Sequence, residues 1–228
     1  MATHLLTGAG AGIGAALARA LADRGDELVL LARNDARATE LADTYPGCRT
    51  LVADLADPAG LAEAVGEQLP DRLDSLVQVA GVVELGAVGE LRPEVWRQTV
   101  DVNLLAPAEL TRLCLPALRA ARGQVVLVNS SAGLTAHAQW SAYAASKHGL
   151  RALADSLRAE ERGSGVRVTT VFPGRTATGM QEKVHRQEGR EYHAGDWIAP
   201  ESVATAILAA LDLPRDAEIT DVTVKPGP

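Results

Sequence analysis

The chain has 228 residues, of which 47% are hydrophobic and 22% charged, so a disordered or fibrous chain is excluded. Its formal net charge of -7 at pH 7 argues against nucleic acid or an anionic membrane as the main partner. Because a single α/β domain commonly reaches this length, we expect residues 1–228 to form one domain.

Signals for membrane insertion or export are not found in the sequence. No apolar run reaches the roughly 18 residues of a transmembrane helix. Met1–Gly14 also lacks the basic and apolar regions of a signal peptide. The two cysteines, Cys48 and Cys114, have no histidine or cysteine partner at metal-binding spacing. We therefore expect a cytoplasmic protein with free thiols and no bound metal.

Seven short apolar runs alternate with longer segments of helical periodicity. Most of the runs are continuously apolar, as expected of strands buried on both faces of a parallel sheet. The alternation predicts an α/β doubly wound Rossmann fold: a seven-stranded, mostly parallel sheet with helices on both faces. The predicted strands are His4–Thr7, Leu28–Ala32, Arg49–Ala53, Ser75–Val79, Gln124–Asn129, Val166–Phe172 and Glu218–Val224. The predicted helices are Gly12–Arg24, Ala36–Thr44, Pro58–Leu69, Pro93–Ala121, Ser141–Arg162 and Pro200–Leu211.

A glycine-rich loop follows the first predicted strand and opens the first helix. Backbone amides at such a helix start can face a pyrophosphate, and glycines permit the close approach. The glycines are spaced Gly-x-x-x-Gly-x-Gly instead of the usual Gly-x-Gly-x-x-Gly, and no Lys-Ser/Thr follows, which excludes a P-loop nucleotidase. The loop predicts dinucleotide binding through Gly8, Gly10, Gly12, Ile13 and Gly14.

The residues after the second predicted strand bear on which dinucleotide binds. An NAD site places an acidic residue there, to bind the ribose 2′-hydroxyl. This chain has Ala32 and then Arg33, whose guanidinium can pair with the 2′-phosphate of NADP. We therefore expect NADP, with NAD as the alternative if Asp35 serves as the acid in a shifted register.

Tyr143 and Lys147 are four residues apart, on one face of the predicted helix Ser141–Arg162. A phenol has an ordinary pKa of about 10 and is a poor acid–base at neutral pH. A nearby ammonium lowers that pKa, as does the positive charge of an oxidised nicotinamide. The pair predicts a proton-transfer unit, although the same spacing alone is common on surface helices.

Three further features occur in order along the chain. Asn103 lies within Asp101–Leu105, Ser130 ends the fifth predicted strand, and Pro173–Thr178 follows the sixth. Together with the glycine-rich loop and the Tyr143 pair, they resemble the short-chain dehydrogenase/reductase family. The resemblance runs from Thr7 to about Val224.

The resemblance implies a role for each matching catalytic residue. Tyr143 would be the general acid–base, and Lys147 would bind the nicotinamide ribose and lower the Tyr143 pKa. Ser130, three residues before Gly133, would hydrogen-bond the substrate carbonyl or hydroxyl. Asn103 would hold a helical kink and a water of the proton relay.

Other matching residues are implied to contact the cofactor. Asp54 would bind the adenine, Ala80 and Gly81 would pack beside the adenosine ribose, and Thr176 and Thr178 would meet the nicotinamide carboxamide. The full set expected at the cofactor is Gly8, Gly10, Gly12, Ile13, Gly14, Arg33, Asp54, Ala80, Gly81, Lys147, Pro173, Gly174, Thr176 and Thr178. One departure is Gln78-Val79, where the family usually has Asn-Asn, which removes polar groups that brace the central sheet.

The segment Arg175–Ala199 interrupts the alternation because it is polar and has little apolar periodicity. We expect an irregular substrate loop or lid at about 175–199, with His185 and His193 solvated on it. His137 is interpreted as a loop histidine, and Trp140 equally as a pocket or a packing residue.

The leading interpretation is an NADP(H)-dependent oxidoreductase that interconverts a carbonyl and a secondary alcohol in a small molecule. The alternative is a catalytically weak NAD(P)-binding regulator on the same fold. The resemblance also implies a homodimer or homotetramer, since apolar positions lie on more than one side of two long helices; a thick core is the alternative explanation. Those positions are Leu104, Leu105, Leu113, Leu150, Leu153 and Leu157.

Overall fold

The computed structural model describes residues 1–227, and within them seven strands form one sheet in the order β3-β2-β1-β4-β5-β6-β7. Every neighbouring pair is parallel, so the doubly wound fold is confirmed and the sheet is wholly parallel. The strands are β1 (Thr3–Thr7), β2 (Glu27–Ala32), β3 (Arg49–Val52), β4 (Ser75–Gln78), β5 (Gln124–Val128), β6 (Arg167–Pro173) and β7 (Asp221–Val224). The α-helices are α1 (Gly12–Asp23), α2 (Asp35–Thr44), α3 (Leu61–Val65), α4 (Pro93–Val100), α5 (Ala106–Ala121), α6 (Ser141–Glu161), α7 (Gly179–Gln187) and α8 (Pro200–Leu211).

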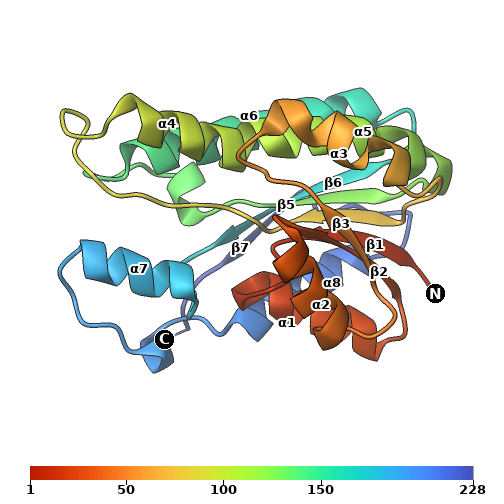
Figure 1. Cartoon of the computed structure of the whole chain (residues 1–228), viewed down its shortest axis with the longest axis horizontal. Coiled ribbons are helices and arrows are strands. Elements are labelled where there is room, and N and C mark those ends of the chain that lie inside the picture. The colour runs from red at the N-terminus through yellow and green to blue at the C-terminus, as the bar shows by residue number, and fades with distance from the viewer. Residues whose placement is uncertain (228) are drawn as a thin grey trace.

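Helices cover both faces of the sheet (Figure 1). On one face α3, α5 and α6 pack against the strands, and on the other α1, α2 and α8 do so. The strands supply both apolar layers at once: Leu5 and Leu6 are adjacent in β1, both are fully buried, and they belong to opposite layers. This arrangement explains why the predicted strands are continuously apolar instead of alternating.

The carboxyl ends of β1 and β4 lie side by side at the point where the strand order reverses. Such switch points are where doubly wound folds bind ligands. Here the Thr7 hydroxyl oxygen accepts hydrogen bonds from the backbone amides of Val79 and Ala80, each over 3.1 Å. The loops that follow the two strands are therefore fixed to each other.

The family usually has Asn-Asn where this chain has Gln78-Val79. The side chain of Gln78 supplies polar contacts at this position. Its side chain is buried, and Nε2 donates to the carbonyl oxygen of Pro107 over 3.0 Å and to the hydroxyl of Thr111 over 2.8 Å. These bonds tie the end of β4 to α5.

The single helix predicted over Pro93–Ala121 is wrong, because a π-helical segment at Asp101–Leu105 separates α4 from α5. The backbone amide of Ala106 donates to the carbonyl of Asp101, five residues earlier. Pro107 has no N–H to donate to the carbonyl of Asn103, four residues before it, which disfavours a regular α-helix here. The predicted helix Pro58–Leu69 is likewise broken, into α3 and two flanking 3₁₀ turns.

The expectation of an irregular lid at 175–199 needs correction, since the segment contains α7. The buried face of α7 consists of Gln181, Val184 and His185. A hydropathy pattern does not register Gln and His as buried residues, so the helical periodicity was hidden. His185 is 2% exposed, which contradicts its predicted solvated position, whereas His193 is exposed as expected.

Most of the leucines that suggested an oligomer are used within one chain. Leu150 and Leu157 are buried, and Leu104, Leu113 and Leu153 are half-buried against the same core. Leu105 is 46% exposed. The core is therefore thick enough to account for most of these apolar positions.

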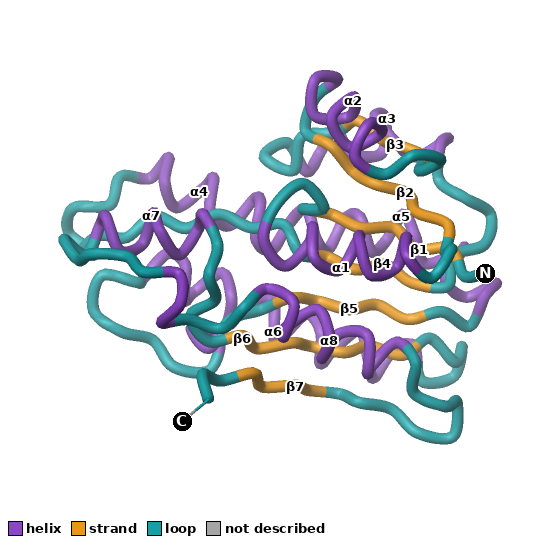
Figure 2. Tube along the Cα trace, turned by 90° about the horizontal axis from the view of Figure 1, so that it is seen from below, coloured by secondary structure: helices purple, strands orange, loops and turns teal. Residues whose placement is uncertain are grey.

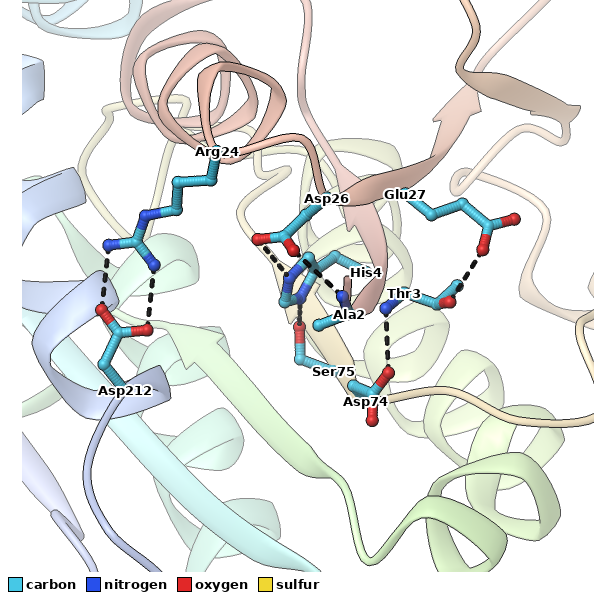
Figure 3. Close-up of polar contacts among 9 residues, drawn as sticks. All are labelled: Ala2, Thr3, His4, Arg24, Asp26, Glu27, Asp74, Ser75 and Asp212. Atoms are coloured by element: carbon cyan, nitrogen blue, oxygen red, sulfur yellow. Dashed lines mark hydrogen bonds and ion pairs between the residues drawn. The ribbon is translucent and has the colours of Figure 1, made fainter.

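A cluster of polar side chains lies at the amino ends of the strands, at the end of the sheet opposite the switch point (Figure 3). His4 is buried there, with Nδ1 at 2.7 Å from the Ser75 hydroxyl and Nε2 at 3.4 Å from an oxygen of Asp26. Asp26 also accepts from the amide of Ala2, and Asp74 from that of Thr3. These contacts join the start of β1 to the segments that lead into β2 and β4.

Helices that could span a membrane and clusters that could hold a metal ion are both absent from the described residues. Among the α-helices of residues 1–227, none is long and apolar enough to cross a membrane. The same residues contain no group of three or more His, Cys, Asp or Glu side chains arranged to hold a metal ion.

Candidate active site

A cavity of about 1040 Å³ opens at the carboxyl ends of the strands. Its volume lies at the upper end of the range of about 300–1,000 Å³ typical of ligand pockets. Loops that follow six of the strands contribute to its wall. The predicted site residues that line it are Gly8, Gly10, Gly12, Ile13, Arg33, Asp54, Ala80, Gly81, Ser130, Tyr143, Lys147, Pro173, Gly174, Thr176 and Thr178. Gly14 and Asn103 stand behind this wall.

The glycine-rich loop leaves no room for side chains where it meets its neighbours. Gly8 and Gly12 have positive φ angles of 74° and 52°. A Cβ atom on Gly14 would lie 2.1 Å from the carbonyl oxygen of Gly8, and one on Gly12 would lie 2.8 Å from Thr178. α1 starts at Gly12 without a side-chain cap or an acidic residue in its first turn. Such a helix start is suited to an anion.

Two arginines, rather than one, face the cavity beyond the end of β2. Arg33 is exposed and follows β2 directly. Arg37, one turn into α2, was missed by the sequence analysis; its guanidinium pairs with Glu40 and lies 3.4 Å from the carbonyl oxygen of Gly10. Asp35, the alternative acidic residue, lies in the first turn of α2 and is not part of the cavity wall.

Ser130, Tyr143 and Lys147 meet at the other end of the cavity. Ser130 follows β5, and its hydroxyl oxygen accepts from the amide of Ala132 over 3.1 Å. Tyr143 and Lys147 lie one turn apart on α6, and Lys147 Nζ is 5.8 Å from the centroid of the Tyr143 ring. Nζ donates to the carbonyl oxygen of Val128 over 3.0 Å, which directs the ammonium toward the end of β5.

Burial controls the protonation of the two α6 side chains. Burial raises the pKa of Tyr143, and a hydrogen bond with the Ser130 hydroxyl opposes this rise. Burial lowers the pKa of Lys147 to about 8. The depressed Tyr143 pKa expected from the sequence is therefore not found, because desolvation of the phenolate outweighs the stabilising groups of the protein. A raised pKa keeps the phenol in its proton-donating form at neutral pH.

Asn103 lies in the π-helical segment, as the expected helical kink requires. Its side chain is buried; Oδ1 accepts from the amide of Val82 over 2.8 Å, and Nδ2 donates to the carbonyl of Val82 and the hydroxyl of Ser146. Ser146 in turn donates to the carbonyl oxygen of Tyr143 over 2.7 Å. Asn103 therefore connects the loop after β4 to the helix that carries Tyr143.

Asn129 also positions the site and was missed by the sequence analysis. Its Oδ1 accepts from the amide of Ser130, and its Nδ2 donates to the carbonyl oxygen of Lys147. A Cβ atom on Gly133 would lie 2.2 Å from Oδ1 of Asn129, so a glycine is required there. The signal in the sequence was a polar residue at the end of a continuously apolar strand.

The other predicted cofactor residues make local hydrogen bonds. Asp54 caps the turn after β3 by accepting from the amide of Ala56 over 2.9 Å. Thr176 donates to the carbonyl oxygen of Gly174 over 3.0 Å. Thr178 is the N-cap of α7 and accepts from the amide of Gln181. These bonds fix the loops after β3 and β6 on two sides of the cavity.

An apolar cluster surrounds the Tyr143 ring on its cavity side. It consists of buried Val83, Ala132, Tyr143 and Val184, with Leu85 and Trp140 packed against them. Trp140 meets the Tyr143 ring edge to face, with centroids 5.8 Å apart, and it also lines the cavity. Trp140 is thus both a packing and a pocket residue. His137 lines the same end from an exposed loop position.

Comparisons with known proteins match most of the chain. The family model described as short chain dehydrogenase matches residues 2–189. Dehydrogenase/reductase SDR family member 7B of Bos taurus is 35% identical over 228 residues, covering 92% of this chain and 70% of that protein. The 2,3-dihydro-2,3-dihydroxybenzoate dehydrogenase of Escherichia coli is 35% identical over 240 residues, covering 97% of this chain and 94% of that protein.

A solved structure has the same arrangement. The alcohol dehydrogenase of the archaeon Thermococcus sibiricus, complexed with 5-hydroxy-NADP, superimposes with a TM-score of 0.82 at 26% identity. The match covers 99% of this chain and 96% of that one.

Proposed function

The chain belongs to the short-chain dehydrogenase/reductase family of oxidoreductases, and from this premise we propose that it interconverts a carbonyl and a secondary alcohol with NADP(H). One observation carries the proposal: Ser130, Tyr143 and Lys147 lie at one end of a cavity whose other end is a glycine cradle. A proton-transfer unit and a dinucleotide cradle in a shared cavity are what hydride transfer to a carbonyl requires.

The residues present fit a dinucleotide. Gly8 and Gly14 closely approach neighbouring backbone, and Gly12 closely approaches the Thr178 side chain, so the loop stays bare of side chains and its backbone amides can face a pyrophosphate. When bound, NADP(H) would supply or accept the hydride. Lys147 would hold the nicotinamide ribose, Asp54 the adenine, and Thr176 and Thr178 the nicotinamide carboxamide.

Proton transfer is assigned to Tyr143. The Ser130 hydroxyl binds the substrate oxygen and orients it toward the phenol. Tyr143 donates its proton to that oxygen during carbonyl reduction and accepts it during alcohol oxidation. Lys147 adds a positive charge beside the phenol. Asn103 holds the loop after β4 against α6 and takes part in proton exchange with water.

The preference for NADP rests on Arg33 and Arg37. Both guanidiniums line the cavity beyond β2, where an NAD site would have an acidic residue. A 2′-phosphate placed between them makes charge-assisted hydrogen bonds that a 2′-hydroxyl cannot make to the same extent. To bind the 2′-phosphate, the Arg37 guanidinium would give up part of its ion pair with Glu40.

The partner and location expectations remain proposals. We infer a homodimer or homotetramer from family membership alone, because the monomer core buries most of the leucines that suggested one. Light scattering at micromolar concentration tests it, and a monomer mass contradicts it. The free thiols Cys48 and Cys114 accord with a cytoplasmic, reducing setting.

A panel of ketones and aldehydes with NADPH or NADH tests the function directly. We expect NADPH oxidation that depends on the added carbonyl and on Tyr143. The alternative, a regulator with little catalysis, predicts tight NAD(P) binding with no turnover on any member. Cofactor affinity measured beside turnover separates the two.

A further inference from the structure

Helix α7 is joined to the loop after β4 by four polar contacts, two of which end on the Glu84 carboxylate. Lys183 Nζ of α7 pairs with Glu84 Oε2 over 2.7 Å and also donates to the carbonyl oxygen of Val83 over 2.8 Å. Gln187 Nε2 donates to Glu84 Oε1, and Gln187 Oε1 accepts from the amide of Leu85 over 3.2 Å. We call these three side chains, Glu84, Lys183 and Gln187, the Glu84 clamp.

The clamp lies beside the apolar cluster that contains Tyr143. Val83 precedes Glu84 and Val184 follows Lys183, and both valines are buried in that cluster. Figure 2 shows α7 beyond the end of the sheet that is remote from the N-terminus. Closing the clamp therefore sets the distance between the two valine-bearing segments, and with it the width of the pocket next to the phenol.

Two ion pairs flank α7 near this end of the cavity. Glu84 pairs with Lys183, and Arg175 makes two hydrogen bonds to Glu188, over 2.8 and 2.6 Å. His137 and Arg190 line the cavity only from exposed positions. The apolar part of the cavity wall next to Tyr143 comes from Val83, Ala132, Trp140 and Val184.

We propose that Glu84 is a positioning residue that clamps α7 over the substrate, so that the enzyme selects compact carbonyl compounds with an apolar substituent. The proposal rests on the proposed function. The clamp excludes wide substrates because it fixes Val83 and Val184 on either side of the pocket. A charged substituent would lose its hydration against these apolar side chains.

The test compares Glu84→Ala and Lys183→Met with a control, Glu90→Ala. Glu90 is exposed in the same loop region, and the structure gives its side chain no hydrogen bond among residues 1–227. The substrates are a single-ring aryl methyl ketone, the same ketone with a ring carboxylate, and a diaryl ketone. Wild type should have its highest kcat/KM with the single-ring aryl methyl ketone.

Glu84→Ala should raise KM for the single-ring ketone about three- to tenfold and leave kcat within about twofold. The ratio of kcat/KM for the single-ring ketone to kcat/KM for the diaryl ketone should be smaller in Glu84→Ala than in wild type, by a similar factor. The Glu84→Ala/Lys183→Met double variant should raise KM further than Glu84→Ala, because Lys183→Met also removes the hydrogen bond to the Val83 carbonyl oxygen. Added salt should raise KM in wild type but not in Glu84→Ala, since the pair is part-exposed.

Hydrogen exchange of the α7 amides gives a readout without cofactor or substrate. Exchange over residues 179–187 should be faster in Glu84→Ala than in wild type and unchanged in Glu90→Ala. If Glu84→Ala has the same exchange rate over residues 179–187 and the same KM as wild type, the positioning role of Glu84 is contradicted. A wild-type preference for the diaryl or carboxylate ketone overturns the substrate class. If no carbonyl is reduced at all, the proposed function fails together with the substrate class, while faster exchange still supports the clamp.

Discussion

Asn129 donates a hydrogen bond from Nδ2 to the backbone carbonyl of Lys147 over 2.9 Å. The same side chain accepts from the amide of Ser130, so one buried residue connects the loop that carries the serine to the helix that carries Tyr143. The spacing between the three proposed catalytic groups therefore depends on a residue whose side-chain amide is bonded within the protein.

Asn129→Ala should lower the free energy of unfolding by about 1–3 kcal/mol, because it removes two buried hydrogen bonds and leaves the Ser130 amide without this partner. It should also lower kcat, because Ser130 and Tyr143 are no longer held in register. Urea unfolding and steady-state kinetics measure both. Asn34→Ala, which removes the N-cap of α2, is the control: it should cost stability by about 0.5–2 kcal/mol and leave kcat unchanged. Equal kcat values for Asn129→Ala and Asn34→Ala contradict the positioning role.

Tyr143→Phe should reduce kcat about 10²–10⁴-fold, because it keeps the ring in the apolar cluster and removes only the exchangeable proton. The dissociation constant of NADPH should not change. Burial raises the Tyr143 pKa, so the phenol is the proton donor at neutral pH, and the rate of carbonyl reduction should be flat there and fall as the pH rises through that raised value. A variant nearly as active as wild type, with chemistry rate-limiting, argues against the mechanism.

Arg33→Ala and Arg37→Ala should each narrow the preference for NADPH over NADH. Losing one charge-assisted contact of about 1.5–3 kcal/mol corresponds to roughly ten- to hundredfold in the dissociation constant of NADPH, with a smaller effect on NADH. Titration of both cofactors by fluorescence gives the constants. Arg112→Ala, on the exposed side of α5, is the matched control. Equal affinity of the wild type for NADPH and NADH refutes the assignment.

Stability should fall at mildly acidic pH because of His4. Burial lowers the pKa of His4 below that of an exposed histidine, although Asp26 opposes this shift and Asp74 adds to that opposition. The unfolded chain then binds a proton at higher pH than the folded one, so the stabilising contribution is present above the ordinary pKa of about 6.5 and is lost as the pH falls through the folded value.

Urea unfolding of wild type and His4→Gln between about pH 5 and pH 8 checks this linkage. The difference in unfolding free energy between them should shrink toward low pH. His193→Gln changes an exposed histidine and should leave the pH dependence of the wild type intact. A His4→Gln curve parallel to wild type shows that His4 does not titrate as described.

The sequence predicted the parts of the site that depend on local pattern. The spacing of Tyr143 and Lys147 places both on one helical face, and the loop between β1 and α1 is set by its glycines. Ser130 was identified through the family resemblance, from its position three residues before Gly133. Each of these follows from neighbours within a few residues.

Residues that reach the site from elsewhere in the fold could not be predicted in this way. Arg37 faces the cavity only because the start of α2 returns over Gly10, a contact across 27 residues of sequence. α7 was hidden because two of its buried residues, Gln181 and His185, are polar and are bonded to each other. The Gln78 contacts depend on the course of α5. The position of Arg37, the buried face of α7 and the Gln78 contacts all depend on tertiary contacts, which a local sequence pattern does not contain.

The π-helical segment Asp101–Leu105 also has a genetic consequence. A π turn holds one residue more than an α-helical path between the same ends needs. Deleting a single codon from this segment would remove the residue that the π turn accommodates and change the register of α5 relative to α4. The deletion would rotate the side chain of Asn103 away from Val82 and Ser146, and so detach it from α6. Functional members of this lineage should therefore tolerate substitutions at the positions flanking Asn103 in residues 101–105 more readily than a change in the number of these residues.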